Sequence, residues 1–338
     1  MTKDILNRLA EGQSLGFAET DSFVDDIAAG NATDAQIAAF LTGLRIKGEC
    51  AEELAGCVSA LRRHAVRVPH NQKTVFDCCG TGGDGSNTSN ISTAAAIVVA
   101  SCGVPTAKHG NRAVSSACGS ADILEEAGAR IDISPEHSAR LLDEIGFCFL
   151  FAPHYHPATM RVAKVRRELG FRTIFNLIGP LLNPAHATHQ IIGTSSPKNA
   201  ALLASVAGHF SQQRIVSFHN SLGVDEILPH CTNIIHRWSD SHTEAETLSV
   251  PAFLGDGFTL DAIKGGDRKT NLVILKEVLS GIISAHSKVT ALNAALGLLC
   301  VGKVSDLEEG YHLAMDSLQS RSAGKLFELY VAMSQETD

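Results

Sequence analysis

The stretch GTGGDGSNTSNIST, residues 80–93, joins an apolar run at residues 75–79 to an alanine-rich run at residues 91–102. The first run is typical of a buried strand and the second of a helix. Glycines at such a junction let backbone N–H groups close around an anion, and the helix start adds partial positive charge. Four polar side chains follow the glycines: Thr88, Asn90, Ser92 and Thr93. The stretch therefore predicts a strand, an anion-binding loop and a helix.

Gly80, Gly82 and Gly85 also fit the dinucleotide pattern GxGxxG. That pattern requires the helix to begin within the motif and an acidic residue about twenty positions further on. Here a polar stretch separates the glycines from the helix, and no acidic residue occurs between Asp84 and Asp122. The nucleotide-binding pattern GxxxxGK[ST] is absent. An anion site is favoured over a dinucleotide site, and a glycine-rich turn without a ligand is the remaining alternative.

Short apolar runs alternate with helical ones beyond this loop. Strands are expected at residues 104–107, 148–151, 190–193 and 214–218. Helices are expected at residues 121–127, 135–145 and 197–209, and then at 271–280, 290–300 and 323–333. Ser134, Pro135 and Gly146 are start and stop signals for the second of these helices. Alternation of this kind predicts an α/β fold with a mostly parallel central sheet covered by helices.

Residues 1–70 contain helical patterns only. Thr33 and Gln36 form a capping-box pattern, and apolar residues follow at helical spacing at Ile37, Phe40, Leu41 and Leu44. Residues 62–70 end in a proline and a histidine and are expected to be the linker. We therefore predict a small helical domain at residues 1–70, joined by helices near 158–182, and an α/β domain at 71–338. Helices this short need a surface to pack on, either the rest of the chain or a second copy.

Composition excludes several classes of protein. The 338 residues are 44% hydrophobic, and 28 basic against 36 acidic residues give a net charge of −8. Proteins that neutralise a nucleic-acid backbone are usually basic, so a nucleic-acid partner is not expected. A membrane partner is not expected either. The nine cysteines include no CxxC pair, and most lie in apolar runs, which favours reduced thiols. The longest apolar stretch is too short to span a bilayer, and a cytoplasmic location is expected.

A second polar loop, KHGNRAVSSACGS, covers residues 108–120 and follows the next predicted strand. Lys108, Arg112 and the serines Ser115, Ser116 and Ser120 are all potential anion donors. Alone, the loop is equally typical of a solvated basic surface. Open α/β sheets place ligands at the carboxyl ends of their strands, so two such loops on consecutive strands favour a shared phosphate site.

Asp225 and Glu226 follow the strand predicted at residues 214–218. Adjacent carboxylates hold Mg²⁺ well when phosphates supply the remaining oxygen ligands. An isolated Asp-Glu pair is more often a solvated turn, so the assignment depends on the neighbouring loops. The pattern predicts a Mg²⁺ site beside them.

The segment FAPHYHPA, residues 151–158, places His154 two residues before His156. No third ligand follows at useful spacing, so a transition-metal site is not favoured. Several basic residues follow, among them Arg161, Lys164 and Arg166. An arginine here can bind a carboxylate through two parallel hydrogen bonds.

Taken in order, the two loops, the segment VRRELGFRTIFNLIGPLLNP at residues 165–184 and the Asp225–Glu226 pair resemble the anthranilate phosphoribosyltransferase family. The resemblance implies a helical domain on an α/β domain and a homodimer formed through the helical part. It implies transfer of the phosphoribosyl group of 5-phosphoribosyl 1-diphosphate (PRPP) to the amine of anthranilate, with Mg²⁺, in tryptophan biosynthesis. Ser89, Asn220-Ser221 and Thr270-Asn271-Leu272 depart from the family pattern.

The resemblance also implies roles for individual residues. The PRPP contacts would be Gly80, Gly83, Asp84, Thr88, Asn90, Ile91, Ser92, Thr93, Lys108, Asn111, Arg112, Ala113, Val114, Ser115, Ser116 and Ser120. The anthranilate contacts would be Gly80, His109, Asn111, His154 and Arg166. The metal ligands would be Ser92, Asp225 and Glu226. No residue is assigned as a catalytic acid or base; Lys108 and the metal would stabilise charge on the leaving group.

Two other functions are weighed against this one. A pyrimidine nucleoside phosphorylase-like enzyme would share the fold and the lysine loop, but residues 109–112, HGNR, and residues 165–170, VRRELG, favour the anthranilate family. A catalytically silent relative that binds nucleotides or nucleic acid would not need Lys108, Asp225 and Glu226, and the net charge of −8 argues against it.

Overall fold

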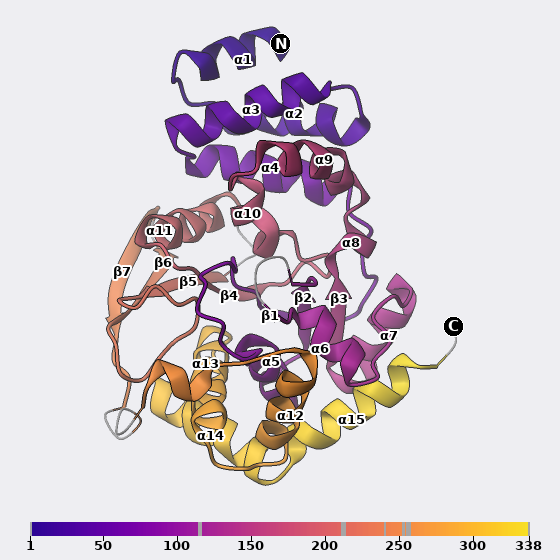
Figure 1. Cartoon of the computed structure of the whole chain (residues 1–338), viewed down its shortest axis with the longest axis vertical. Coiled ribbons are helices and arrows are strands. Elements are labelled where there is room, and N and C mark those ends of the chain that lie inside the picture. The colour runs from indigo at the N-terminus through magenta and orange to yellow at the C-terminus, as the bar shows by residue number, and fades with distance from the viewer. Residues whose placement is uncertain are drawn as a thin grey trace.

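The computed structural model describes residues 2–113, 117–210, 214–239, 241–251, 254 and 258–336. A small helical lobe lies above a larger lobe built around a sheet, with further helices below it (Figure 1). The predicted fold class, a helical domain on an α/β domain, is confirmed.

Four helices open the chain: α1 (Thr2–Ala10), α2 (Phe17–Ala29), α3 (Asp34–Lys47) and α4 (Ala51–Arg63). The predicted capping box is present, because the Thr33 side chain accepts from the Gln36 backbone and the Gln36 side chain accepts from the Thr33 N–H. The apolar faces of these helices share one core with α9 (Met160–Leu169) and α10 (Phe175–Ile178). A segment from the middle of the chain thus completes the helical lobe.

The sheet has seven strands in the order β3-β2-β1-β4-β5-β6-β7. Their bounds are β1 (Phe76–Cys78), β2 (Thr106–Gly110), β3 (Phe147–Phe151), β4 (His189–Gly193), β5 (Arg214–Asn220), β6 (Asn233–Ser239) and β7 (His242–Leu248). The first five pair in parallel, as predicted, whereas β6 and β7 are antiparallel and were not predicted. β7 reads HTEAETL and is mostly exposed, so it has no apolar alternation to mark it as a strand.

One face of the sheet packs on α5 (Ile91–Ser101), which lies against α13 (Ala285–Cys300), α14 (Leu307–Gln319) and α15 (Ser322–Ser334). The other face carries α11 (Pro197–Ser205) and the helical lobe (Figure 1). α6 (Ser120–Glu126), α7 (Pro135–Ile145) and α12 (Arg268–Leu279) complete the body. The core between these layers is mainly apolar, and it supports the loops that follow the strands.

Several predicted boundaries were wrong. β2 begins two residues later than predicted and continues to Gly110, because its pairing with β3 runs through to Phe151. Lys108 and His109 therefore belong to the strand and not to the loop. The helix predicted at 197–209 ends at Ser205 and continues as the 3₁₀ helix Val206–His209. α8 (Ala152–Tyr155) and the 3₁₀ helices Pro157–Thr159, Gly179–Leu182 and Leu260–Ile263 form the remaining connections. Among the helices in the described residues, none has the length and hydropathy to cross a membrane.

Candidate active site

The loops after β1, β2 and β5 meet at one edge of the sheet. β1 lies between β2 and β4, and β4 lies between β1 and β5, all of them parallel. Their carboxyl ends therefore face the same way. This is the edge at which open α/β sheets bind ligands, and it faces the helical lobe (Figure 1).

Asp225 is held against the glycine-rich loop by three close approaches. Its Oδ2 accepts the Gly82 N–H at 3.0 Å, and its own N–H donates to Asp84 Oδ2 at 3.2 Å. A Cβ at Gly80 would lie 2.7 Å from Asp225 Oδ2, and one at Gly193 would overlap the Asp225 carbonyl. Only glycine fits at these two positions, so the glycines bring the loop and the acidic turn into contact.

Asn220 shapes the turn that carries Asp225 and Glu226. The side chain is 4% exposed. Its Oδ1 accepts the N–H of Leu222 at 2.9 Å and of Val224 at 3.2 Å. Its Nδ2 donates to the carbonyls of Val224 at 2.9 Å and Glu226 at 2.8 Å. Asn220, which departs from the family pattern, is thus the residue that fixes the turn. Its role could not be predicted from the sequence, because its four partners come together only in the folded loop.

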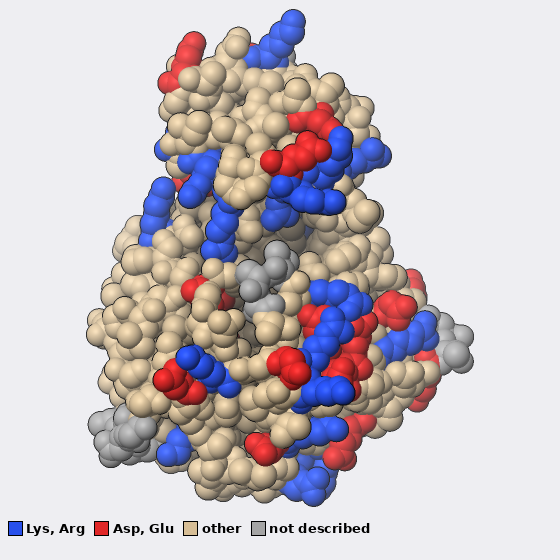
Figure 2. Space-filling model, viewed as in Figure 1, with Lys and Arg blue, Asp and Glu red and all other residues tan. Residues whose placement is uncertain are grey.

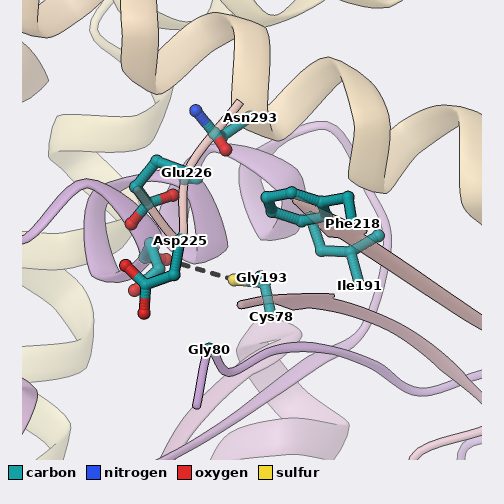
Figure 3. A pocket seen from close by; sticks show the side chains of 10 residues that line it. Cys78, Gly80, Ile191, Gly193, Phe218, Asp225, Glu226 and Asn293 are labelled. Carbon is teal, nitrogen blue, oxygen red and sulfur yellow. Dashed lines mark hydrogen bonds between the residues drawn. The ribbon is translucent and has the colours of Figure 1, made fainter. Parts of the chain in front are cut away.

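The two acidic side chains line a small cavity of about 10 Å³, room for one water-sized species. Figure 3 shows their carboxylates on one side of it and Phe218 with Ile191 on the other. Burial, together with the neighbouring Asp84 carboxylate, raises the pKa of Asp225 to about 7. Burial and Asp225 raise the pKa of Glu226 well above its ordinary value. Crowded buried carboxylates of this kind favour a bound cation.

Ser92, the third predicted metal ligand, lines the same cavity from the start of α5. Among the described residues, no group of three or more His, Cys, Asp or Glu side chains has the arrangement of a complete metal cage. Mg²⁺ is usually held by one or two carboxylates, waters and substrate phosphates, so two carboxylates and a hydroxyl at a phosphate loop fit its chemistry.

Lys108 lies beneath this site on β2 and is 2% exposed. Its Nζ donates to the His109 carbonyl at 3.1 Å. Burial acts to lower the pKa of the ammonium, but the acidic groups of Cys79, Cys78, Asp77 and Glu226 outweigh it and hold the pKa above its ordinary value. The site therefore contains a buried lysine whose pKa is not lowered, next to the acidic turn.

The remaining residues predicted in the first loop have different environments. Gly83, at φ +68°, packs against the Arg172 side chain, and Thr88 forms an isolated bridge with Lys264. Asn90 Nδ2 donates to the Cys118 carbonyl at 3.2 Å and so joins the two loops. The Asn90 Oδ1 and Thr93 Oγ1 atoms are buried without a partner among the described residues. Ile91 packs in a small core with Val224 and Ile263, and its backbone N–H donates to the Ser89 carbonyl at 2.7 Å.

The two ends of the second loop approach each other, and we call this place the neck of the loop. It contains Asn111, Ala113 and Ser120. The predicted contacts Val114, Ser115 and Ser116 lie outside the described residues. The Asn111 carbonyl accepts the Ser120 hydroxyl at 3.3 Å. Arg112 pairs through both terminal nitrogens with Glu125. This ion pair is partly exposed to solvent, where such pairs are weak, so the phosphate contact of Arg112 stays a prediction.

The predicted anthranilate residues differ in their exposure. His109 is 3% exposed, both its ring nitrogens lack partners within the described chain, and its ring meets that of His156 edge-on at 5.2 Å. Burial lowers the pKa of His156 to about 4 and that of His109 well below its ordinary value, so both rings are neutral at pH 7. His154 is exposed and its ring packs on that of Tyr155, whereas His156 is buried.

Arg166 projects from α9 with its guanidinium 5.5 Å from the centre of the Phe175 ring. Burial lowers the pKa of this half-buried group. None of the acidic side chains in the described part of the chain forms an ion pair with it. A partly desolvated arginine without a carboxylate partner can accept a carboxylate ligand.

Two further contributors had no sequence signal. Asp77, fully buried on β1, accepts from Asn183 Nδ2 at 2.9 Å and from the His109 N–H at 3.2 Å. Arg172 donates to the carbonyls of Gly82 at 2.6 Å and Gly83 at 3.2 Å. Lys and Arg side chains gather at the junction of the two lobes, beside a hollow in the surface (Figure 2). Arg172 thus ties the segment after α9 to the glycine-rich loop.

Comparison with known proteins agrees with this geometry. Residues 72–324 match the family model described as "Glycosyl transferase family, a/b domain", and residues 3–65 match "Glycosyl transferase family, helical bundle domain". The chain is 42% identical to the anthranilate phosphoribosyltransferase of Symbiobacterium thermophilum, over 96% of each chain. The chain belongs to the anthranilate phosphoribosyltransferase family. The Desulforamulus reducens family member is 39% identical, over 99% of this chain and 97% of its own.

Solved structures of anthranilate phosphoribosyltransferases superpose over nearly the whole chain. The enzyme from Thermus thermophilus has a TM-score of 0.92 at 36% identity and covers 98% of this chain and 100% of its own. The Saccharomyces cerevisiae enzyme, solved in complex with PRPP and Mg, has a TM-score of 0.88 at 27% identity and covers 98% and 97%. The family function, transfer of a phosphoribosyl group in tryptophan biosynthesis, is therefore assigned to this chain.

Proposed function

We propose that the site at the carboxyl edge of the sheet transfers the phosphoribosyl group of PRPP to the amine of anthranilate, releasing pyrophosphate. One observation carries the assignment of the site. The glycine-rich loop and the Asp225–Glu226 turn meet at one edge of the sheet, where Gly80, Ser92 and both carboxylates line one cavity. The buried Lys108 lies on β2, the strand next to β1. That combination suits a substrate that carries several phosphates.

In this proposal the glycine-rich loop and the neck of the second loop bind PRPP. Gly83 and Asp84 offer backbone N–H groups, while Thr88, Asn90 and Thr93 offer side chains of which two have unused buried atoms. Lys108 faces the edge with its charge preserved, so it can stabilise the negative charge that develops on the leaving pyrophosphate.

Ser92, Asp225 and Glu226 would hold Mg²⁺, and the ion, when bound, neutralises charge on the diphosphate. The chain's part is to present two carboxylates at a fixed spacing from the phosphate loop, which Asn220 and the Gly82 N–H accomplish. The yeast structure with PRPP and Mg supports magnesium as the cofactor.

Arg166 is proposed to pair with the anthranilate carboxylate, with His109 and Asn111 beside the ring. The aromatic amine of anthranilate is neutral at pH 7 and needs orientation more than deprotonation. The low pKa of His109 keeps that ring neutral, so it does not repel a cationic reaction centre. The related yeast structure with 4-fluoroanthranilate supports an anthranilate site in this fold.

The assembly and location are also proposals. We place the helical domain at residues 1–70 with helices near 158–182, and the α/β domain at 71–338, in line with the shared core of α1–α4, α9 and α10. Ile46 on α3 and Met160 on α9 are 82% and 69% exposed, and the two helices contact each other. These apolar side chains support a homodimer through the helical domain. A cytoplasmic location fits free cysteines throughout the described chain.

Arg166→Ala tests the site, with Arg167→Ala as the matched control because Arg167 is exposed on the same helix. Initial rates are followed through the loss of anthranilate fluorescence with PRPP and Mg²⁺. Losing a charge-assisted pair should raise the anthranilate KM about tenfold or more in Arg166→Ala and leave the PRPP KM nearly unchanged. Equal changes in both KM values, or an equal change in the control, would refute the assignment. Phosphorolysis of thymidine or uridine by the wild type would favour the phosphorylase alternative.

A further inference from the structure

Asp122 on α6 is a buried carboxylate to which the proposed reaction gives no role. It is 2% exposed, and its Oδ2 accepts two backbone N–H groups, from Ala113 and from Gly119, each at 2.9 Å. Its Oδ1 accepts the guanidinium of Arg268. Although burial acts to raise the pKa of this carboxyl, the two amides and Arg268 hold it below its ordinary value. The carboxylate is therefore charged and fully partnered at neutral pH.

The two amides that converge on Asp122 come from opposite ends of the second loop. The ends are in direct contact: Ala121 N–H donates to the Asn111 carbonyl at 3.2 Å, and a Cβ at Gly119 would overlap the Ala113 nitrogen. A single carboxylate oxygen thus closes the neck of the loop. Asn111, Ala113 and Ser120, three of the proposed PRPP contacts, lie at that neck.

Arg268 reaches Asp122 from the first residue of α12. The residues just before that helix are bound to the first loop. Ser89 N–H donates to the Ile263 carbonyl at 3.0 Å, and Gly265 N–H donates to the Asn87 carbonyl at 2.8 Å. A Cβ at Gly265 would lie 3.0 Å from the Thr88 oxygen, so the two segments are in close contact. We name residues 263–268 the strap, because this segment contacts the first loop and, through Arg268 and Asp122, the second.

We propose that Asp122 and Arg268 are positioning residues that hold the two PRPP-binding loops at a fixed separation through the strap. This inference rests on the proposed function for its consequence in catalysis, since it requires the loops to bind PRPP. Neither residue touches the substrate. Arg268 acts through Asp122, and Asp122 acts through the neck of the second loop.

The mechanism predicts a specific pattern of coupling. Asn at position 122 keeps an oxygen for the amides but loses the charge that attracts Arg268. Met at position 268 keeps the length of the side chain but leaves Asp122 with the amides and with Arg112, whose Nη1 lies 3.6 Å from Oδ1. Because both changes break the same link, the double variant Asp122→Asn/Arg268→Met should be no worse than the poorer single variant.

Steady-state kinetics test this proposal. Asp122→Asn and Arg268→Met are expected to raise the PRPP KM about tenfold, as for lost charge-assisted hydrogen bonds, and the anthranilate KM less than twofold. Lys269→Ala, an exposed neighbour on the same helix, is the control and should match the wild type. Equal increases in both KM values, or effects of the two single variants that multiply in the double variant, would overturn the proposal.

Hydrogen–deuterium exchange separates failure of the strap from failure of the function, because it needs no substrate. In both single variants, peptides covering residues 108–120 should exchange several-fold faster than in wild type, whereas peptides covering α13 should be unchanged. Unchanged exchange over 108–120 would overturn the strap even if the enzyme is active. Faster exchange in a protein whose wild type does not turn over PRPP would uphold the strap and refute the proposed function.

Discussion

Replacing Asp225 by asparagine should stabilise the protein without metal while abolishing its response to Mg²⁺. The pKa of this carboxyl is raised from 3.8 to about 7, first by burial and then by the Asp84 carboxylate. A carboxyl that ionises less readily in the folded state lowers stability as pH rises above 3.8, and the loss is complete above about 7. Asparagine removes this charge but keeps an oxygen to accept the Gly82 N–H.

The magnitude follows from the two pKa values. Each unit corresponds to about 1.4 kcal/mol, so the shift from 3.8 to about 7 sets an upper limit of about 4 kcal/mol. Asp225 is partly exposed to solvent, which reduces the gain to about 1 to 3 kcal/mol. For a chain of 338 residues, that raises the Tm by about 1 to 4 °C.

The assay is thermal unfolding in EDTA at pH 8 and at pH 5, for the wild type and for Asp225→Asn. The variant should be more stable at pH 8, and its advantage should fall by more than half at pH 5, where the native carboxyl is already protonated. Adding Mg²⁺ and PRPP should then stabilise the wild type strongly and the variant little. A variant that is no more stable than wild type in EDTA at pH 8, or that gains as much from Mg²⁺ and PRPP, would refute the reasoning.

Three further outcomes are expected. Gly193→Ala, whose Cβ would overlap the Asp225 carbonyl, should displace the acidic turn and lower kcat at least about tenfold at saturating Mg²⁺; kinetics equal to those of wild type would contradict this close approach. Asn183→Leu removes one hydrogen-bond donor from the buried Asp77 carboxylate and should lower the free energy of unfolding by about 2 to 4 kcal/mol. Urea denaturation measures this loss, and a loss below about 1 kcal/mol would count against the Asp77–Asn183 hydrogen bond. Since the pKa of His156 is about 4, ionisation of this ring should cause no change in kcat between pH 5 and 9. A change in kcat over this pH range that disappears in His156→Phe would show that the ring is not neutral there.

The position of the site at the carboxyl edge of the sheet could be predicted because the motifs that mark it are short segments of sequence. Glycines after a strand, an adjacent acid pair and a lysine near the next strand are visible without knowing the fold. The Thr33 cap and the helical faces of the first domain are likewise set by neighbours within a turn. The same locality explains why the parallel strands were predicted and β7, with its exposed polar residues, was not.

The residues that support the site could not be predicted in the same way. Asn220, Asn183 and Asp122 are polar side chains whose partners are fixed only when distant segments pack together. Arg112 is a related case: a basic residue in a phosphate loop is predicted to contact phosphate, and the folded chain also pairs its guanidinium with Glu125 on α6. A basic residue in a loop predicts an anionic partner, but the sequence alone does not show whether that partner is a substrate phosphate or a carboxylate of the same chain.

The most direct test of the account is the stoichiometry of the reaction. Purified protein is mixed with anthranilate, PRPP and Mg²⁺, and the loss of anthranilate fluorescence is measured together with the release of pyrophosphate. One pyrophosphate should be released for each anthranilate consumed, with neither change when PRPP or Mg²⁺ is omitted. Pyrophosphate release that continues without anthranilate at the same rate, or no anthranilate loss above a control without protein, would contradict it.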